Sequence, residues 1–331
     1  MPNSDASLSP HLFTAELPEA PTRDGFGTGV VAAGEKDPRV MVLCADLAES
    51  TRADAFQTRF PDRFVEMGIT EQHMAAAASG MAAVGAVPFI ASYAAFSPGR
   101  NYEQIRTTIA LNQSNVKVCG MHAGISVGPD GATHQMLEDV GLMRMIPGMT
   151  VIAPMDAEEA RKAVLAAAGH EGPVYLRFGR APTPVLSTEA TPFTLGKALP
   201  LWRAQTRPDV AILSTGALAY EALRAARDLQ KEGVEVHVIH FPTIKPLDTE
   251  AVCNAAREAR RIVTVEEHQV FGGFGSAVAE VLAENLPVPI RFVGVRDRFG
   301  QSGTPSELLR EYEIDARAVC ESVHACVRDT R

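Results

Sequence analysis

The segment FVEMGITEQHM, residues 64–74, places an acidic side chain where an apolar strand gives way to a helix. Glu71 would stand in the first turn of that helix, where the helix dipole favours negative charge, so one interpretation is a capping role. The following residues, 74–83, are almost entirely apolar and predict a buried helix. A carboxylate at the mouth of a buried helix loses hydration and can hold or share a proton near neutral pH. Capping and proton chemistry both remain open for Glu71.

The loop MHAGISVGPDGATHQMLED, residues 121–139, brings together His122, Asp130 and His134 within thirteen residues. A lone histidine is more often structural than catalytic. Two histidines and an aspartate on one loop that a rigid scaffold holds favour a site that hydrogen-bonds a polyhydroxylated substrate or moves protons. Metal binding is the weaker interpretation, because no spacing of the HExxH kind accompanies these residues.

Two further short segments carry aromatic and basic side chains at strand ends. YAAF supplies Tyr93 and Phe96, which could be a core aromatic pair or a flat apolar slot for a ring. YLRFGR supplies Arg177 and Arg180, which could be ordinary surface arginines or could grip a phosphate bidentately. Residues 265–276, VEEHQVFGGFGS, match the nucleotide-binding GxGxxG pattern incompletely, so a tight turn is the favoured interpretation there.

Short β-branched runs alternate with helical patterns from residue 22 onward, which is typical of a mostly parallel sheet with helices on both faces. We expect strands at residues 40–44, 64–67, 87–91, 116–121, 150–153 and 174–177, and helices near 23–36, 71–84, 102–113, 135–145 and 156–169. Ligands of open α/β sheets bind beyond the carboxyl ends of the strands. The polar and aromatic residues that follow these strands should therefore line one cleft.

A second alternating series follows a composition break at about residues 181–208. Its strands are expected at residues 210–213, 234–239, 262–266 and 288–293, and its helices at 216–232, 248–259, 275–285 and beyond 305. The predicted fold class is α/β, with two consecutive domains of mostly parallel sheet. The domains are assigned to residues 22–185 and 208–331, joined by a linker at 186–207.

The bulk composition excludes several classes of function. The formal net charge of −9 argues against nucleic acid or an anionic membrane as a partner, and no apolar run reaches the length of a membrane span. Residues 1–21 lack the pattern of a signal peptide and are expected to form a disordered tail. The five cysteines are scattered and show no CxxC spacing, which favours a reducing cytoplasm over a disulfide framework or a zinc site.

The motifs GITEQHM, YAAF, VGPDGATHQMLED, IPGMTVIAPMDAEEA and GPVYLRFGR, in that order and spacing, resemble the pyrimidine-binding domain of transketolase. VIHFPTIKPLD and VEEHQVFGGFGSAVAEVL resemble its C-terminal domain, and the resemblance spans about residues 22–330. A complete transketolase also has an N-terminal domain, which binds the pyrophosphate of thiamine diphosphate and its Mg²⁺ through a GDG motif and a following asparagine. This sequence contains no GDG motif. The resemblance therefore implies one subunit of a split transketolase, inactive without a separate partner that holds most of the Mg²⁺ site.

The resemblance also implies which residues meet the cofactor. Glu71 matches the catalytic glutamate that hydrogen-bonds the pyrimidine nitrogen, promotes the imino tautomer and helps the thiazolium carbon lose its proton. Tyr93 and Phe96 match the aromatic residues that pack the pyrimidine ring, with Arg100 nearby in a loop one residue longer than in single-chain enzymes. Asp46 matches an acidic residue at the interface with the cofactor-binding subunit.

The substrate residues implied by the resemblance fall into two groups. Asp130 and His134 match the catalytic pair that reads the sugar hydroxyls around the reacting carbon. Four residues match those that bind the substrate phosphate: Arg23, Ser50, His122 and Arg180. The implied reaction moves a two-carbon ketol unit from a ketose phosphate to an aldose phosphate. The implied assembly is an α2β2 heterotetramer, with a homodimer of this chain as the other possibility.

Three alternatives share parts of this pattern. The beta subunits of 2-oxo acid dehydrogenases share the glutamate and the fold, but they handle unphosphorylated acids and usually show an HSQ-type sequence where this chain has ATHQ. Deoxyxylulose phosphate synthase resembles the GITEQHM and DGATH segments but is a single longer chain. A non-catalytic scaffold homologue is the third, although a scaffold has no physical need for this complete set of site residues.

Overall fold

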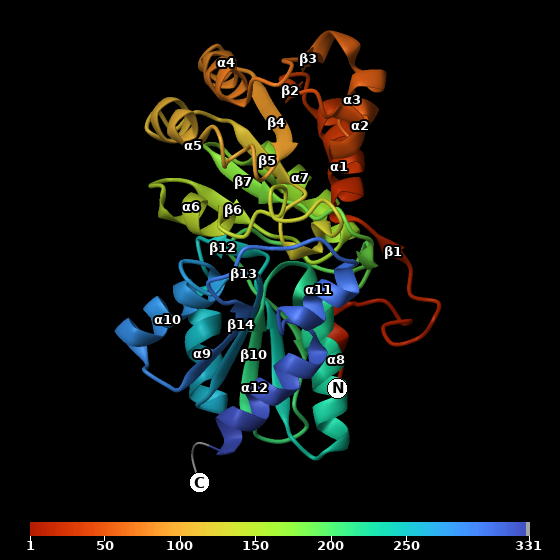
Figure 1. Ribbon diagram of the computed structural model, residues 1–331, viewed down its shortest axis with the longest axis vertical. Coiled ribbons are helices and arrows are strands. Elements are labelled where there is room, and N and C mark those ends of the chain that lie inside the picture. The colour runs from red at the N-terminus through yellow and green to blue at the C-terminus, as the bar shows by residue number, and fades with distance from the viewer. Residues whose placement is uncertain (329–331) are drawn as a thin grey trace.

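The β-branched runs of the sequence form two mostly parallel sheets, one in each of two domains that lie one above the other, in a computed structural model that describes residues 1–328 (Figure 1). The seven strands of the first sheet lie in the order β12-β6-β7-β5-β4-β2-β3. Six of them are mutually parallel: β2 (Val40–Cys44), β3 (Phe64–Glu66), β4 (Val87–Tyr93), β5 (Lys117–Met121), β6 (Thr150–Ile152) and β7 (Val174–Arg177). The expected strands are thus confirmed, and their carboxyl ends meet at one edge of the sheet.

Helices cover both faces of this sheet, as parallel strands require. They are α1 (Thr22–Lys36), α2 (Ala48–Thr51), α3 (Asp54–Arg59), α4 (Glu71–Ala83), α5 (Tyr102–Gln104), α6 (Asp139–Met145) and α7 (Ala157–Gly169), with short turns η2 (Pro61–Arg63) and η4 (Ile125–Val127). Helices α1 and α7 pack together, and their apolar residues share one core with a face of the sheet. Within residues 1–328, no helix combines the length and apolar character that crossing a bilayer needs.

The helix that begins at Glu71 differs from its prediction. Met74, Ala75 and Ala78 of α4 are buried against the sheet, but Ala76 and Ala83 are not. Only one face of the helix is therefore buried. Alanine favours the helical state without needing burial, so an alanine-rich run predicts the helix more firmly than it predicts the environment.

The second sheet has the order β14-β13-β10-β11-β9 and forms the lower domain of Figure 1. Its strands are β9 (Leu199–Trp202), β10 (Val210–Ser214), β11 (Val236–His240), β13 (Ile262–Gln269) and β14 (Ile290–Val295), of which only β9 runs antiparallel to its neighbour. Its helices are η5 (Gly216–Leu218), α8 (Ala219–Lys231), α9 (Thr249–Ala259), α10 (Phe274–Asn285), α11 (Pro305–Glu311) and α12 (Ala316–Arg328). Two consecutive α/β domains are confirmed.

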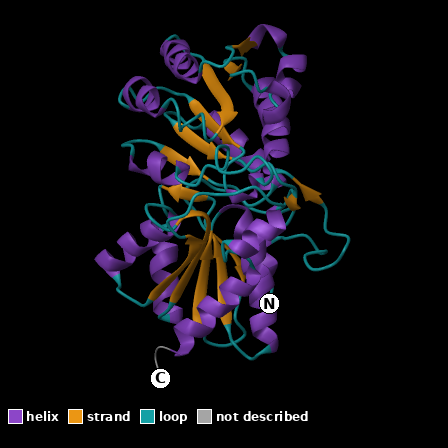
Figure 2. Ribbon diagram, viewed as in Figure 1, coloured by secondary structure: helices purple, strands orange, loops and turns teal. Residues whose placement is uncertain are grey.

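The two domains share structure across their boundary. Strand β12 (Thr243–Lys245) belongs to the second half of the chain but pairs antiparallel with β6 of the first sheet. One apolar core includes Met74 and Ile90 from the first domain with Phe241 and Phe274 from the second. Figure 2 shows loops gathered between the two sheets, where the domains meet. The domains therefore form a joined pair rather than two units on a free linker.

The prediction of a disordered tail over residues 1–21 is wrong. The backbone N–H of Asn3 donates to the carbonyl of Leu201 at 2.8 Å, and Leu12, only 6% exposed, joins the core of the second domain. This segment also contains the turn η1 (Ser4–Ala6) and strand β1 (Glu19–Ala20), which pairs with β8 (Thr183–Pro184). Its Pro, Ser and Asp content suggests disorder. Its few spaced apolar residues pack against the core of the second domain, and the sequence does not show that contact.

Three other elements differ from expectation. The predicted linker contains a regular strand, β9, at the edge of the second sheet. The helix expected at 102–113 is a short α5 followed by the π-helix η3 (Ile105–Ala110). The helix expected at 135–145 begins only at Asp139, because the residues before it belong to an irregular loop.

Replacing Leu12 with alanine tests the packed N-terminal segment. Because Leu12 is buried in a core, Leu12→Ala should lower the free energy of unfolding by about 2 kcal/mol in urea denaturation. Leu111→Ala is the matched control, since Leu111 is 78% exposed and its loss should change stability by less than about 0.5 kcal/mol. Equal effects of the two substitutions would mean that the segment does not pack in solution.

Candidate functional site

The candidate site lies at the carboxyl edge of the first sheet, where the loops after β2, β4, β5 and β7 meet the start of α1 and α4. The parallel register sets Tyr93 at the end of β4 directly beside Met121 at the end of β5. The residue after Met121 is His122, so the aromatic segment and the histidine-bearing loop emerge side by side. Sheet geometry thus brings together segments that are about thirty residues apart in sequence.

Glu71 is the first residue of α4 and is 1% exposed. Its Oε2 accepts a hydrogen bond of 2.7 Å from Nη1 of Arg100, while Oε1 has a long contact of 3.5 Å with the hydroxyl of Ser92. The amide of Asn101 donates to the Glu71 carbonyl at 3.1 Å and also to the hydroxyl of Ser97 at 3.1 Å. The carboxylate is therefore held by side chains and by its helix, and Oε1 keeps capacity for a further hydrogen bond.

Four aromatic rings form a continuous surface next to this carboxylate. Tyr93 stacks on His122 with ring centroids 3.8 Å apart, and on Phe96 at 5.8 Å. His134 meets the edges of both Tyr93 and Phe96, at 6.1 and 5.6 Å. The guanidinium of Arg100 lies 4.6 Å from the centre of the Phe96 ring. Tyr93 and Phe96 are only partly buried, so part of this aromatic surface is open to a flat ligand.

Positive groups gather at the other end of the aromatic surface. Nη1 of Arg23 donates to the carbonyl of Ser50 at 2.7 Å and lies 3.4 Å from Nε2 of His122. Nη1 of Arg180 donates to the carbonyl of Val127 at 2.8 Å and lies 4.0 Å from a carboxylate oxygen of Asp130. Ser50 thus contacts this cluster through its backbone carbonyl, and a role for its hydroxyl in binding phosphate stays a prediction.

The electrostatics of this cluster favour an anion. Burial, followed by the charges of Arg23 and Arg180, lowers the pKa of His122 from 6.5 to about 3. Burial, followed by the charge of Arg52, also lowers the pKa of Arg23. In both groups the charges of neighbouring arginines lower the pKa further than burial does alone, and that positive field would attract an anion.

Two buried polar atoms of the cluster have no hydrogen-bond partner within residues 1–328: Nε of Arg23 and Nδ1 of His122. Because a guanidinium can only donate, Nε2 of His122 must act as the acceptor facing Arg23. The neutral imidazole then carries its proton on Nδ1. Both unpartnered atoms are therefore donors, as an oxyanion requires.

Asp130 and His134 lie on the same loop, close to the aromatic surface. His134 is held by its ring contacts with Tyr93 and Phe96 and by a 2.9 Å contact between its Nδ1 and the hydroxyl of Thr133. Asp130 is exposed at the loop tip beside Arg180. The pair can offer a carboxylate and an imidazole to hydroxyl groups.

Asp46 follows β2 at an exposed position with a left-handed φ of 58°. Its backbone N–H donates to Oε1 of Glu66 at 2.8 Å, and the same oxygen accepts from the N–H of Gly68. Glu66 therefore ties the loop after β2 to the segment that leads into Glu71. A place for Asp46 at a subunit interface stays a prediction.

The structure removes Arg177 from the possible phosphate-binding residues. Its Nε donates to Oδ2 of Asp139 at 2.8 Å, and the two side chains are 10% and 0% exposed. Sequence reasoning missed Ser92 and Asn101, which hold Glu71, and Arg52, which adds charge near Arg23. Asn101 gave a weak signal, since it directly precedes α5 in the position that favours capping residues.

The glycine-rich turn of the second domain does not present its N–H groups to a ligand. The carboxylate of Glu266 accepts from the backbone N–H groups of Phe274 and Gly275, at 2.6 and 2.8 Å, at the start of α10. The interpretation as a tight packed turn is therefore confirmed.

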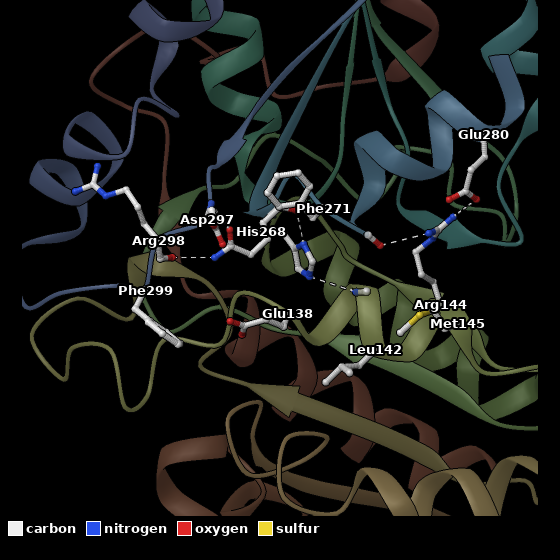
Figure 3. Close-up of a pocket in the computed structure, with 13 residues that line it drawn as sticks. Glu138, Leu142, Arg144, Met145, His268, Phe271, Glu280, Asp297, Arg298 and Phe299 are labelled. Carbon is white, nitrogen blue, oxygen red and sulfur yellow. Dashed lines mark hydrogen bonds and ion pairs between the residues drawn. The ribbon is translucent and has the colours of Figure 1, made fainter. Parts of the chain in front are cut away.

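A separate hollow of about 590 Å³ lies between the two domains (Figure 3). Its walls include Leu142 and Arg144 of α6 together with His268, Phe271 and Phe299 of the second domain. None of the candidate catalytic, cofactor or phosphate residues lines it. The size of a cavity would therefore select a place without the candidate catalytic residues, so we assign the site by the side chains that it contains.

Comparison with known proteins identifies the class of this chain. Residues 19–184 match the pyrimidine-binding domain of transketolase, and residues 201–319 match the transketolase C-terminal domain. The chain belongs to the transketolase family.

Three similar proteins carry names that refer to divided transketolases. The 6-deoxy-6-sulfo-D-fructose transketolase subunit SqwH of Clostridium sp. (strain MSTE9) is 39% identical, with 94% of this chain and 96% of the relative covered. One subunit of the apulose-4-phosphate transketolase of Phocaeicola vulgatus is 36% identical, with 91% and 95% covered. A solved structure titled as a split gene transketolase in an inactive beta4 tetramer is 41% identical, with a TM-score of 0.87 and 94% and 99% covered.

The depressed pKa of His122 predicts a pH dependence of stability. The imidazole is neutral in the fold down to about pH 3, whereas the unfolded chain takes up a proton below about pH 6.5. The contribution of the neutral His122 imidazole to the free energy of unfolding is therefore complete above pH 6.5, and it is lost as the pH falls toward 3. Between pH 7 and pH 5, the parent should lose up to about 2 kcal/mol more unfolding free energy than His122→Asn does. Equal pH slopes in urea denaturation would contradict this assignment.

Proposed function

We propose that this chain is one subunit of a thiamine diphosphate-dependent transketolase that moves a two-carbon ketol unit from a ketose phosphate to an aldose phosphate. The observation that carries the proposal is one unbroken series of contacts. It starts at the buried Glu71, which Arg100 links to Phe96. It continues over Tyr93 to His122 and ends at Arg23. Consecutive contacts thus connect a carboxylate, a ring surface and an anion site.

The residues at the carboxylate end fit the pyrimidine end of thiamine diphosphate. Oε1 of Glu71 has capacity to share a proton with a ring nitrogen, and the partly exposed Phe96 offers a ring face beside it. When bound, the cofactor supplies an electron sink for cleaving the bond next to a carbonyl. Glu71 then holds or releases a proton, and Tyr93 and Phe96 fix the ring plane. Arg100, which pairs with Glu71, can keep the carboxylate oriented before the ring enters.

The opposite end of the site fits a sugar phosphate. Arg23, His122 and Arg180 present donors to a terminal oxyanion, and the proton on Nδ1 of His122 is one of them. Asp130 lies beside Arg180, and His134 lies against Tyr93 and Phe96, where the two can hydrogen-bond sugar hydroxyls and exchange protons with them. A dedicated anion site speaks against unphosphorylated 2-oxo acids as the main substrates.

The proposed site is half of a complete one. The part that would hold the pyrophosphate and Mg²⁺ belongs to a separate GDG-bearing subunit, and within residues 1–328 no cluster of His, Cys, Asp and Glu could hold a metal. Asp46 and Arg100, both exposed, would face that partner in an α2β2 heterotetramer. The described cysteines are all free thiols, which supports the cytoplasm as the proposed compartment.

The nature of the terminal anion is a separate point of substrate choice. The names of two relatives refer to a sulfonated sugar and to a phosphorylated sugar. Phosphate and sulfonate are both tetrahedral oxyanions, and a cluster of donors of this kind can accept either. A sulfonated ketose is therefore the second candidate donor.

A coupled ketol-transfer assay tests the proposal. Xylulose phosphate, ribose phosphate, thiamine diphosphate and Mg²⁺ are supplied to this chain alone and to its mixture with the candidate GDG-bearing subunit. We expect activity only in the mixture. Glu71→Gln is the matched variant, since it keeps the shape of the side chain, and it should fold and associate normally but lose more than about tenfold in rate, about 1.4 kcal/mol of barrier. Silence of an associated mixture with both phosphorylated and sulfonated donors would refute the proposal.

Arg180→Ala tests the anion site separately. The variant should raise KM for phosphorylated donors by about tenfold or more, because a charge-assisted hydrogen bond is lost. Hydroxypyruvate, a donor without a phosphate, serves as the internal control and should keep its KM within about threefold. An equal rise for both donors would remove Arg180 from the anion site.

A further inference from the structure

The loop that carries His122, Asp130 and His134 rests on the second domain as well as on the sheet that bears it. Turn η4 within this loop packs beside α11, and Figure 1 shows the loop between the upper sheet and that helix. No strand of the first sheet pairs with the 124–135 stretch. Its backbone polar groups must therefore be satisfied by other partners.

Glu267 of the second domain is one of these partners. It stands near the end of β13 and is 7% exposed. Its Oε1 accepts a hydrogen bond of 2.6 Å from the backbone N–H of Ser126 in η4. The carboxylate lies so close to Gly124, whose φ is 91°, that any side chain there would collide with it. Carboxylate and loop are thus fitted to each other.

The carboxylate is itself fixed in a low-dielectric setting. Burial raises the pKa of Glu267, and the nearby charge of Arg177 opposes that rise. Nη2 of Arg177 donates to the backbone carbonyl of Glu267 at 2.9 Å. The acceptor of the Ser126 N–H is thus buried and belongs to a residue whose backbone is also held, so this contact fixes the position of η4.

A second tie runs through the side-chain amide of Gln135. Its Nε2 donates to the carbonyls of Ile125 and Gly128 within the loop, both at 3.1 Å, and to that of Gln301 in the second domain at 2.9 Å. On the other side, Arg180 donates to the carbonyl of Val127. The residue next to the Glu267 contact therefore carries a direct contact to the anion site.

We propose that Glu267 of the second domain is a positioning residue for the sugar phosphate: its carboxylate sets the shape of η4, and through it the places of Arg180, Asp130 and His134. This inference rests on the proposed function for its substrate. It gives the second domain a role in catalysis beyond assembly, since the substrate loop is shaped against that domain. Glu267 acts through the loop and touches neither substrate nor cofactor.

The test uses three substitutions of Glu267 and one matched control, each in the complex with the GDG-bearing subunit. Glu267→Ala removes the acceptor and should raise KM for both sugar phosphates by about tenfold while kcat changes by less than about threefold. Glu267→Gln keeps an acceptor oxygen in place and should restore KM to within about threefold of the parent. Glu267→Asp withdraws the carboxylate and should give an intermediate KM.

Glu266→Ala is the control, because Glu266 is the neighbouring buried glutamate of the same strand but bonds to α10 instead of the loop. It should lower thermal stability without changing KM. Hydrogen exchange of residues 124–131 in the isolated chain gives a readout that does not depend on activity. Exchange there should accelerate in Glu267→Ala and stay at the parent rate in Glu266→Ala.

The outcomes separate this inference from the proposed function. An inactive parent complex would refute the proposed function, and the exchange measurement would still decide whether Glu267 shapes the loop. An active parent complex with unchanged KM in Glu267→Ala would overturn the positioning role. If Glu267→Ala fails to fold, Glu267→Asp decides by the same two measurements, and parent-like KM and exchange in that variant would also overturn it.

Discussion

The buried ion pair between Arg177 and Asp139 holds the junction on which both the domain arrangement and the substrate loop depend. Oδ2 of Asp139 accepts from Nε of Arg177 at 2.8 Å and from the hydroxyl of Tyr175 at 2.7 Å. Nη2 of the same arginine donates to the carbonyls of Glu267 and Met136. Burial pushes the pKa of Asp139 upward, but the charge of Arg177 brings it below its ordinary value. Such a pair does little for net stability, yet removing one partner leaves a buried charge uncompensated. Through the bond from Arg177 to the Glu267 carbonyl, the pair also ties the end of the first sheet to the second domain.

The candidate site depends on this junction because its loop occupies the space between the domains. Residues that bind a substrate must be held within fractions of an ångström, and an irregular loop cannot hold its own shape without external partners. Here the partners come from both sides: Arg180 from the end of the first sheet, and Glu267 and Gln301 from the second domain. The fold thus places the arginine side chains that would contact an anion. Burial keeps His122 neutral, so its Nδ1 can donate a hydrogen bond.

Features that depend on neighbouring residues in the sequence could be predicted, whereas features that depend on distant residues could not. The strands could be predicted because a run buried on both faces needs nearly continuous β-branched and apolar residues, as in β2 and β10. The place of Glu71 could be predicted because a helix start is a local event. Arg177 and Arg180, in contrast, are three residues apart and similar in sequence, but one is sealed against Asp139 and the other faces Asp130. No local pattern separates them, because the difference lies in what packs against each.

The sequence by itself determined the alternation of strands and helices, the family, and the identity of the groups able to do chemistry, since these depend on residue type and near neighbours. Only the tertiary structure decided that Leu12 of the N-terminal segment packs in the core of the second domain, that Ser50 meets Arg23 through its carbonyl, and that Glu267 reaches Ser126 across 141 positions of the chain. Each of these contacts joins residues far apart in sequence. Such a contact stabilises the protein only after folding has buried both partners and removed their water. The order of residues along the chain does not show which distant residues will meet in this way.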